Sequence, residues 1–242
     1  MNNYLKWTEL FNRTNHLQWK SKEYIHGKDN HIHTTEYSVV EDAQHQCIRI
    51  DFQCTDSESD WKANFEFPKV YYRNIKTNFG NITLKAHGGW AAMYKSVKDN
   101  VIGMVQNYLK MNPDFDIIIV GFSLGSALAQ LCAQDVYYHT GKKVYLYTFG
   151  SVNPFACNLL EKRRIIKYLR SCCQEVYNFS NLTDVVSYVP FCLWGYHKIR
   201  RVTVGRFRWL KRLLVLPVIV GLFFPHYYHA HYENEKWYKG IK

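Results

Sequence analysis

No internal repeat, low-complexity tract or linker rich in proline, glycine or serine interrupts this sequence. These absences give no reason to divide the chain into repeats or into several domains. With 242 residues, the chain is long enough to bury one sizeable core. Hydrophobic residues make up 47% of it, which argues against a disordered chain. We therefore predict a single domain spanning residues 1–242.

The sequence also lacks a recognisable targeting segment and a membrane span. Its start, MNNYLKWTELFNRTNHLQWK, has no basic stretch followed by an apolar one, so no signal peptide is predicted. The apolar run LLVLPVIVGLFF (213–224) is shorter than the roughly 20 residues of a spanning helix, and Pro217 and Gly221 interrupt it. The seven cysteines form no C-x-x-C pair, and their odd number indicates reduced thiols. Together these features predict an intracellular protein.

Positive charge is plentiful, but no compact run of lysine and arginine stands out. The formal net charge is +11, which attracts anionic partners such as nucleic acid or an acidic membrane surface. The densest basic stretches, EKRRIIKYLR (161–170) and HKIRRVTVGRFRWLKR (197–212), are interleaved with apolar residues. For the first stretch a solvated basic face is the simpler interpretation. This interleaving favours contact with an anionic membrane surface, and we do not expect a nucleic-acid partner.

The second half of the chain alternates between strand and helix patterns. A helix is expected around residues 4–20, followed by strands at 33–41 and 45–53. A second helix is expected where apolar residues recur from Tyr94 to Tyr108, and it closes at Asn112-Pro113. The alternation that follows comprises strands at 115–122, 143–150 and 174–181 with helices at 126–141 and 156–171. This order predicts an α/β fold with a mostly parallel sheet, whose ligands gather at the carboxyl ends of the strands.

The stretch VGFSLGSALAQ (120–130) places Ser123 between Gly121 and Gly125, where a buried strand passes into a helix. Gly-x-Ser-x-Gly in that setting is typical of a nucleophile elbow, in which a strained serine projects its hydroxyl above the sheet. The helix that begins at Leu124 directs its first amides toward an oxyanion formed there. A tight turn made for packing alone is the alternative explanation.

A nucleophilic serine needs a base and an orienting carboxylate, which in this architecture follow in the order Ser, Asp or Glu, His. Asp184, just past a strand end, is the candidate carboxylate, and Asp135 inside a helix is the alternative. The base is expected in PHYYHAHYENEKWYKGIK, which contains His226, His229 and His231. No cysteine or acidic residue lies at metal-ligand spacing from these histidines, so neither a metal nor a cofactor is expected.

From about residue 35 to about residue 240 the sequence resembles the class 3 lipases, the fungal-lipase-like branch of the α/β-hydrolases. The resemblance is carried by ordered stretches: FQCTDSESDWKANFEF, KAHGGWAAMYKSV, VGFSLGSALAQL, YTFGSVNP and NLTDVVSYVP. It implies an α/β-hydrolase fold with Ser123 as nucleophile and Asp184 as triad carboxylate. It also implies an oxyanion hole formed by the amides of Leu124 and Thr55.

The base implied by the resemblance is His229, which forms a His-x-x-Tyr pattern with Tyr232, or His231, which lies closer to the final helical stretch. His226 is a third candidate, and His87 is expected to support the oxyanion loop. The sequence departs from the family pattern at Gln53-Cys54, at Phe122 and at Ser126. The first of these changes puts a side chain into the oxyanion loop.

The expected function is therefore that of a serine hydrolase acting on lipid esters through an acyl-enzyme. The alternative is an inactive lipase-like domain that binds membranes or a protein. Residues 206–225 are expected to form an apolar flap or interfacial anchor, with a buried core segment as the alternative. Arg206, Arg208, Lys211 and Arg212 would then meet anionic headgroups. Neither the lipid class nor the oligomeric state follows from the sequence.

Overall fold

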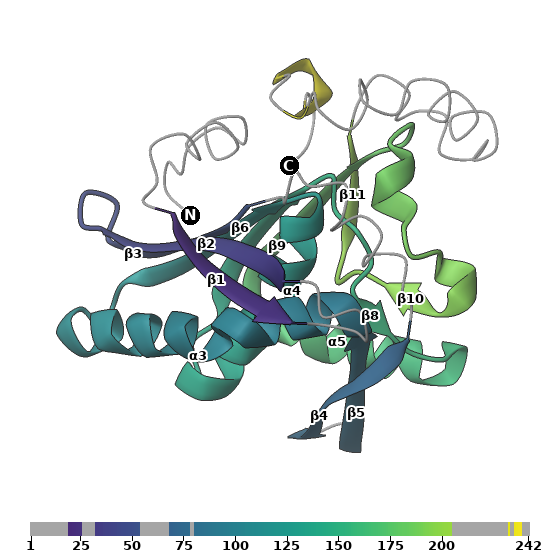
Figure 1. Cartoon of the computed structure of the whole chain (residues 1–242), viewed down its shortest axis with the longest axis horizontal. Helices are drawn as coiled ribbons and strands as arrows, with labels where there is room; N and C mark the ends of the chain where they lie inside the picture. The colour runs from purple at the N-terminus through teal and green to yellow at the C-terminus, as the bar shows by residue number, and fades with distance from the viewer. Residues whose placement is uncertain are drawn as a thin grey trace.

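The computed structural model describes residues 19–25, 32–53, 68–77, 80–204, 232 and 235–238. Within these ranges, a seven-stranded sheet forms the centre of the molecule in the order β1-β2-β3-β6-β7-β9-β11 (Figure 1). Its strands are β1 (Lys20–Ile25), β2 (Ile32–Asp42), β3 (Cys47–Phe52), β6 (Asp116–Phe122), β7 (Val144–Phe149), β9 (Cys173–Asn181) and β11 (Arg201–Val204).

Most of this sheet is parallel. β3, β6, β7, β9 and β11 pair in parallel, whereas β1, β2 and β3 form an antiparallel edge. The predicted strands at 115–122, 143–150 and 174–181 correspond to β6, β7 and β9, and those at 33–41 and 45–53 correspond to β2 and β3. The predicted parallel sheet is therefore confirmed, and its carboxyl ends meet at one edge.

Three long helices cover one face of the sheet. They are α3 (Gly88–Met111), α4 (Leu124–Thr140) and α5 (Leu159–Ser171). α3 ends at Asn112 as predicted, and α4 ends at Gly141, which has the left-handed backbone (φ 71°) that closes helices. α5 begins later than predicted, because Phe155 and Ala156 form the short strand β8.

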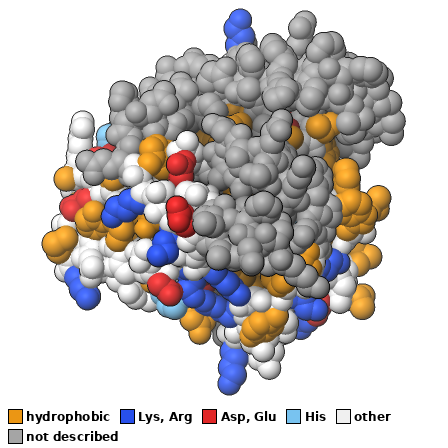
Figure 2. Space-filling view, in the orientation of Figure 1, with side chains coloured by type: hydrophobic (Ala, Val, Ile, Leu, Met, Phe, Trp, Pro, Cys, Tyr) orange, Lys and Arg blue, Asp and Glu red, His pale blue; other side chains and the backbone are white. Residues whose placement is uncertain are grey.

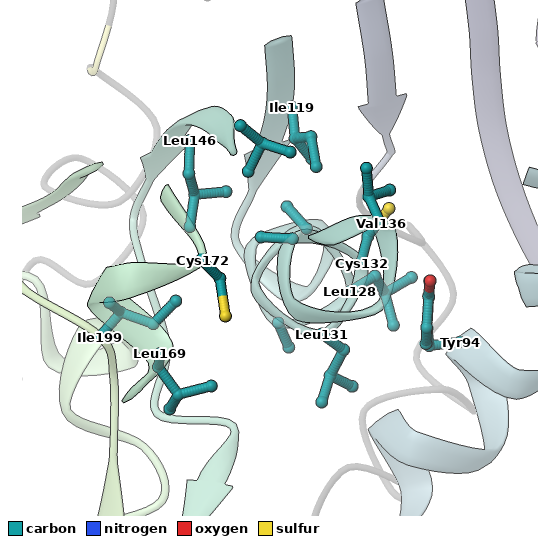
Figure 3. Close-up of a cluster of buried hydrophobic side chains, with 14 of the residues drawn as sticks. Tyr94, Ile119, Leu128, Leu131, Cys132, Val136, Leu146, Leu169, Cys172 and Ile199 are labelled. Carbon is teal, nitrogen blue, oxygen red and sulfur yellow. The ribbon is translucent and has the colours of Figure 1, made fainter. Parts of the chain in front are cut away.

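α4 lies at the centre of the core. Every residue from Leu124 to Val136 is buried, including small residues that let the helix approach the sheet closely. Figure 3 shows Leu131 and Cys132 on α4 between Tyr94 of α3 on one side and Leu169 on the other, with Ile119 of the sheet nearby. The buried part of α4 includes its first turn, which directly follows the candidate nucleophile.

The opposite face of the sheet is aromatic. Along β6, Ile117 and Ile119 face the helices, and Ile118 and Val120 face the other way. The latter two belong to a second apolar cluster, which also contains Tyr147, Phe149, Phe179, Tyr232 and Tyr238. Tyr232 and Tyr238, the latter in the 3-10 helix η5 (Glu235–Tyr238), therefore bring part of the C-terminal region onto the sheet.

A smaller sheet, β10-β8-β5-β4, lies beside the helices. It consists of β4 (Lys69–Thr77), β5 (Gly80–His87), β8 (Phe155–Ala156) and β10 (Tyr196–His197). β4 and β5 were not predicted from the sequence. In β5 the buried residues Ile82, Leu84 and Ala86 alternate with exposed ones, which is the period-two signal of a strand.

The predicted flap at 206–225 lies outside the described residues. Of the predicted helix at 4–20, the structure describes only residues 19 and 20, and Lys20 begins the strand β1. Among the helices that the structure describes, none is both long and apolar enough to cross a membrane.

Candidate active site

Ser123 lies at the junction of β6 and α4, at the carboxyl edge of the parallel sheet. Its backbone angles are φ 52° and ψ −120°, a conformation that non-glycine residues rarely adopt. Its N–H donates to the carbonyl of Phe149, at the end of the neighbouring strand β7, at 2.9 Å. This strained serine directly precedes α4, which is the backbone arrangement expected of the predicted elbow.

The two glycines of the elbow are required by close backbone contacts. A Cβ atom on Gly121 would lie 2.3 Å from the carbonyl oxygen of Gly125 and 2.9 Å from the Cβ of Ala129. A Cβ atom on Gly125 would lie 2.3 Å from the carbonyl oxygen of Phe52, the last residue of β3. The start of α4 therefore touches both β6 and the end of β3, where the stretch containing Thr55 begins.

A buried polar network lies beneath the elbow. The Ser126 hydroxyl accepts a hydrogen bond from the N–H of Val152 at 3.0 Å. The side-chain amide of Gln130 donates to the carbonyls of Ser126 and Val152, both at 3.1 Å, and its oxygen accepts from the N–H of Ile199 at 3.2 Å. The departure from glycine at position 126 thus supplies a bond that fixes the loop after β7. A polar Gln130 inside the apolar stretch SALAQL was the available signal of this network.

Asp184 follows the carboxyl end of β9, two strands away from β6 in the sheet. Its side chain is buried, and its Oδ1 accepts from the N–H of Val186 at 3.1 Å. Val186 belongs to the 3-10 helix η2 (Val185–Tyr188), and Ser187 of the same helix donates its hydroxyl to the Asp184 carbonyl at 2.8 Å. The carboxylate is therefore fixed in place at the same sheet edge as Ser123.

Tyr232 reaches the same carboxylate from the C-terminal region. Its hydroxyl donates to Oδ2 of Asp184 at 2.7 Å and accepts from the N–H of Asn181 at 2.7 Å. Burial, followed by the charge of Asp184, raises the pKa of Tyr232 well above its usual value, so the phenol stays protonated and remains a donor. Phe122, where the family pattern has histidine, packs edge-on against the Tyr232 ring at 6.2 Å.

Lys198 is fully buried next to the Asp184 loop, and sequence reasoning gave no signal of its role. Its ammonium group donates to the carbonyls of Ser151 and Ser187 and to the Ser180 hydroxyl, the latter at 3.0 Å. Arg201 donates to the same Ser187 carbonyl at 2.9 Å. Burial lowers the pKa of Lys198 well below its usual value. These contacts connect the loops after β7 and β9, on either side of the candidate site.

The structure describes some of the remaining candidate residues and not others. Asp135 is buried inside α4, where it accepts from the Tyr72 hydroxyl and pairs with Arg73, each at 2.7 Å. His87 caps α3 by accepting from the N–H of Trp90 at 3.4 Å, and its ring stacks on that of Trp90. Thr55 of the oxyanion loop and the three histidines 226, 229 and 231 lie outside the described residues. Leu124 is the first residue of α4, next to the candidate nucleophile.

The comparisons with known proteins agree with this geometry. The family model described as lipase (class 3) matches residues 49–194. The chain belongs to the class 3 lipase family. It is 28% identical over 172 residues to the lipase of Rhizomucor miehei, and the aligned stretch covers 68% of this chain and 43% of that relative. It is 25% identical over 170 residues to the secreted mono- and diacylglycerol lipase A of Penicillium cyclopium, covering 69% of this chain and 51% of that relative.

Solved structures of class 3 lipases share the fold. The native Rhizomucor miehei lipase propeptide complex superposes with a TM-score of 0.62 at 23% identity, over 80% of this chain and 58% of that chain. A fungal lipase–inhibitor complex gives the same TM-score and identity over 68% of its chain. The predicted α/β-hydrolase fold is therefore confirmed. The chain spans about half the length of the relatives it matches.

The expectation of an intracellular protein was wrong on this comparison, because the Penicillium relatives are named as secreted lipases. The cysteines explain the error. Within the part of the chain that the structure describes, the cysteines are free, and all except Cys192 are buried. A buried cysteine packs as a small hydrophobic side chain, so its free thiol does not indicate a compartment.

Proposed function

We propose that this protein is a serine hydrolase that cleaves lipid esters. The observation that carries the proposal is the strained Ser123 at the start of α4, with the Asp184 carboxylate held at the same sheet edge by Val186 and Tyr232. A structural serine needs no such strain, whereas a nucleophile that must stand clear of the sheet does.

In the proposed reaction, the Ser123 hydroxyl oxygen attacks the ester carbonyl carbon while a histidine takes the hydroxyl proton. The resulting oxyanion is stabilised by the amides of Leu124 and Thr55, and the positive end of the α4 dipole lies nearby. The carbon–oxygen bond to the alcohol breaks, and the histidine returns its proton to the leaving group. Water then releases the acid from the acyl-enzyme. Asp184 orients the imidazole and stabilises its charged form.

We assign the base to His229 or His231. Support comes from Tyr232, whose hydroxyl contacts Asp184 and thus ties this part of the sequence to the carboxylate. The two candidates are separated by His229→Ala and His231→Ala, measured with a soluble short-chain ester. The variant that loses activity by about 10,000-fold or more identifies the base, because removing a triad residue costs from about 10,000-fold to about a million-fold in rate.

Acylglycerols are the first substrates to test, since the Penicillium relatives are named as mono- and diacylglycerol lipases. Phospholipids are the alternative lipid class, and we propose peripheral contact with an anionic membrane surface in either case. We further propose that residues 1–242 form one domain. A series of glycerides, phospholipids and esters of increasing chain length, hydrolysed by purified protein, determines the substrate class.

A fluorophosphonate probe tests the proposal directly, because it reacts with an activated serine. We expect labelling of the wild type and none of Ser123→Ala, with Ser126→Ala as a control that keeps the nucleophile. A folded wild type that neither reacts with the probe nor cleaves any ester would contradict the proposal. It would favour the alternative of an inactive domain that binds membranes or a protein.

A further inference from the structure

Three leucines stand almost fully exposed near one another. Leu159 and Leu160, the first residues of α5, are 84% and 93% exposed, and Leu193 of the 3-10 helix η3 (Cys192–Trp194) is 97% exposed. Phe191, which precedes η3, and Trp194, its last residue, are about half-exposed, and their rings meet edge-on at 5.1 Å. We call these five residues the α5–η3 surface.

The two parts of this surface are adjacent because β8 and β10 pair beneath them. Ala156 pairs with Tyr196, and the N–H of Cys157 donates to the carbonyl of Gly195 at 2.9 Å. Leu159 lies two residues after Cys157, and Trp194 directly precedes Gly195, so this bonded pair brings the two parts of the surface together. Figure 2 shows hydrophobic side chains gathered along the right edge of the molecule, where Figure 1 places β10 and the start of α5.

The fold itself does not account for these leucines. α5 packs against the core through Ile165, Tyr168 and Leu169, which are all buried. Its first turn is already capped, because the Asn158 side chain accepts from the N–H of Glu161 at 2.8 Å. Leu159 and Leu160 thus add nothing to packing or capping, and exposed clusters of large apolar side chains mark interaction surfaces.

Cations flank the α5–η3 surface. The helix α5 carries a single acidic residue, Glu161, against five basic ones: Lys162, Arg163, Arg164, Lys167 and Arg170. Of the five, all but the half-buried Lys162 are exposed. On the other side, a Cβ atom placed on Gly195 would lie 3.0 Å from the ammonium of Lys69, which also sits over the Tyr196 ring. Apolar side chains with a cationic border complement an anionic lipid surface, in which headgroups are negative and the layer beneath is apolar.

The surface adjoins the candidate active site. The segment from Asp184 to Gly195 leads directly from the triad carboxylate to η3. It is anchored by Asn153, whose side-chain amide donates to the carbonyls of Tyr188 at 3.0 Å and Pro190 at 2.8 Å. This anchored segment connects the α5–η3 surface with Asp184 at the carboxyl edge of the sheet.

We infer that the α5–η3 surface docks this protein on anionic phospholipid membranes, with the leucines and Trp194 entering the headgroup region and the α5 cations binding the lipid phosphates. The inference deepens the proposed lipid-ester hydrolysis by naming the surface that brings the site to its substrate. It is independent of residues 206–225, because every residue that carries it is described by the structure.

The test uses Ser123→Ala protein, so that the lipids stay intact. Its binding to phosphatidylcholine vesicles, with or without phosphatidylglycerol, is measured by sedimentation. We expect binding to the vesicles that contain phosphatidylglycerol and a loss of about tenfold or more in affinity when Leu160→Ser and Leu193→Ser are combined. Replacing Arg163 and Lys167 by glutamine should weaken binding by about fivefold for each charge, and high salt should remove this difference.

Matched controls use α3, which ends on the opposite side of the molecule (Figure 1). Met111→Ser removes a side chain that is 65% exposed there, and Lys110→Gln removes an exposed charge. Both controls should bind vesicles like the parent protein. An environment-sensitive fluorophore on the exposed Cys192, in a Cys54→Ser background, should shift to the blue on anionic vesicles. The same label on Met111→Cys, in a background that also carries Cys192→Ser, should not shift.

Two results would overturn the inference. One is unchanged vesicle binding in the leucine variant. The other is a dimer in lipid-free solution that the leucine variant converts to a monomer, which would make the surface a protein interface. The proposed hydrolysis fails separately: a wild type that cleaves no soluble ester, while Ser123→Ala still binds vesicles through these leucines, refutes the activity and leaves the docking surface intact.

Discussion

Replacing Gly125 with alanine tests whether the elbow depends on the contact between α4 and β3. The added Cβ atom would lie 2.3 Å from the carbonyl oxygen of Phe52, whereas real Cβ contacts essentially never fall under 3.0 Å. Both sides of this contact are backbone, so no flexible side chain can yield. The start of α4 and the end of β3 must therefore separate by about 0.7 Å, the difference between these two distances, which is overpacking of a well-filled core.

This shift would displace the helix start that carries Ser123 from the stretch that carries Thr55. A misplacement of about 1 Å in a catalytic site can cost about 100-fold in rate. We expect kcat/KM for a soluble short-chain ester to fall by about that factor in Gly125→Ala, and the free energy of unfolding to fall by about 1–3 kcal/mol. Ester kinetics and denaturant unfolding measure the two effects.

Gly103→Ala is the matched control. Gly103 lies inside α3, and a Cβ atom there would have nothing within 4 Å. This variant should keep wild-type activity and gain about 0.5–1 kcal/mol in stability, because alanine has the higher helix propensity. Wild-type activity in Gly125→Ala would refute the reasoning, since it would show that the oxyanion loop tolerates displacement of α4.

Three further substitutions test the surroundings of the site. Tyr232→Phe removes the hydroxyl that donates to Asp184 and accepts from the Asn181 N–H. The free energy of unfolding should fall by about 1–3 kcal/mol, as measured by denaturation, and ester kinetics should show a larger change in kcat than in KM. Lys198→Met leaves its buried acceptors unpaired and should destabilise the fold by a similar amount of about 1–3 kcal/mol; unchanged unfolding would contradict the assigned contacts. Burial, then Lys162 and Lys69, lowers the pKa of His197 to about 4. The unfolded chain binds this proton near pH 6.5 and the folded protein only near pH 4, so the free energy of unfolding should fall as the pH drops through this window. We expect His197→Gln to lose about 1–3 kcal/mol less than the wild type between pH 7 and pH 4.5, as measured by denaturant unfolding at both pH values.

Elements with strong local signals were predictable from the sequence. β6 is an unbroken apolar run, and α4 follows it and ends at Gly141 in a left-handed conformation. Ser123 and Asp184 could be named because the first directly follows a predicted strand and the second lies three residues past the end of another. Parallel pairing also brings these two strand ends to one edge without any further information.

The contacts that hold the site in place were not predictable. Tyr232 reaches Asp184 across 48 positions of sequence, and Lys198 reaches Ser151 across 47. Such pairings depend on how distant elements pack, which no local pattern encodes. The strands β4 and β5 were missed for a different reason: Ile82, Leu84 and Ala86 alternate clearly, but their partner β4 has a bulge between Tyr71 and Arg73 and a mixed composition.

The bond from Tyr232 to Asp184 also has a consequence for the order of events during synthesis. The strands and helices from β3 to β9 are all encoded by residue 181, whereas β10 and β11 follow it in the chain. The carboxylate gains its second partner only when residue 232 is available, and Tyr238 then donates to the carbonyl of Tyr232. In a growing chain, the Asp184 carboxylate can therefore complete these contacts only after residue 232 has been made.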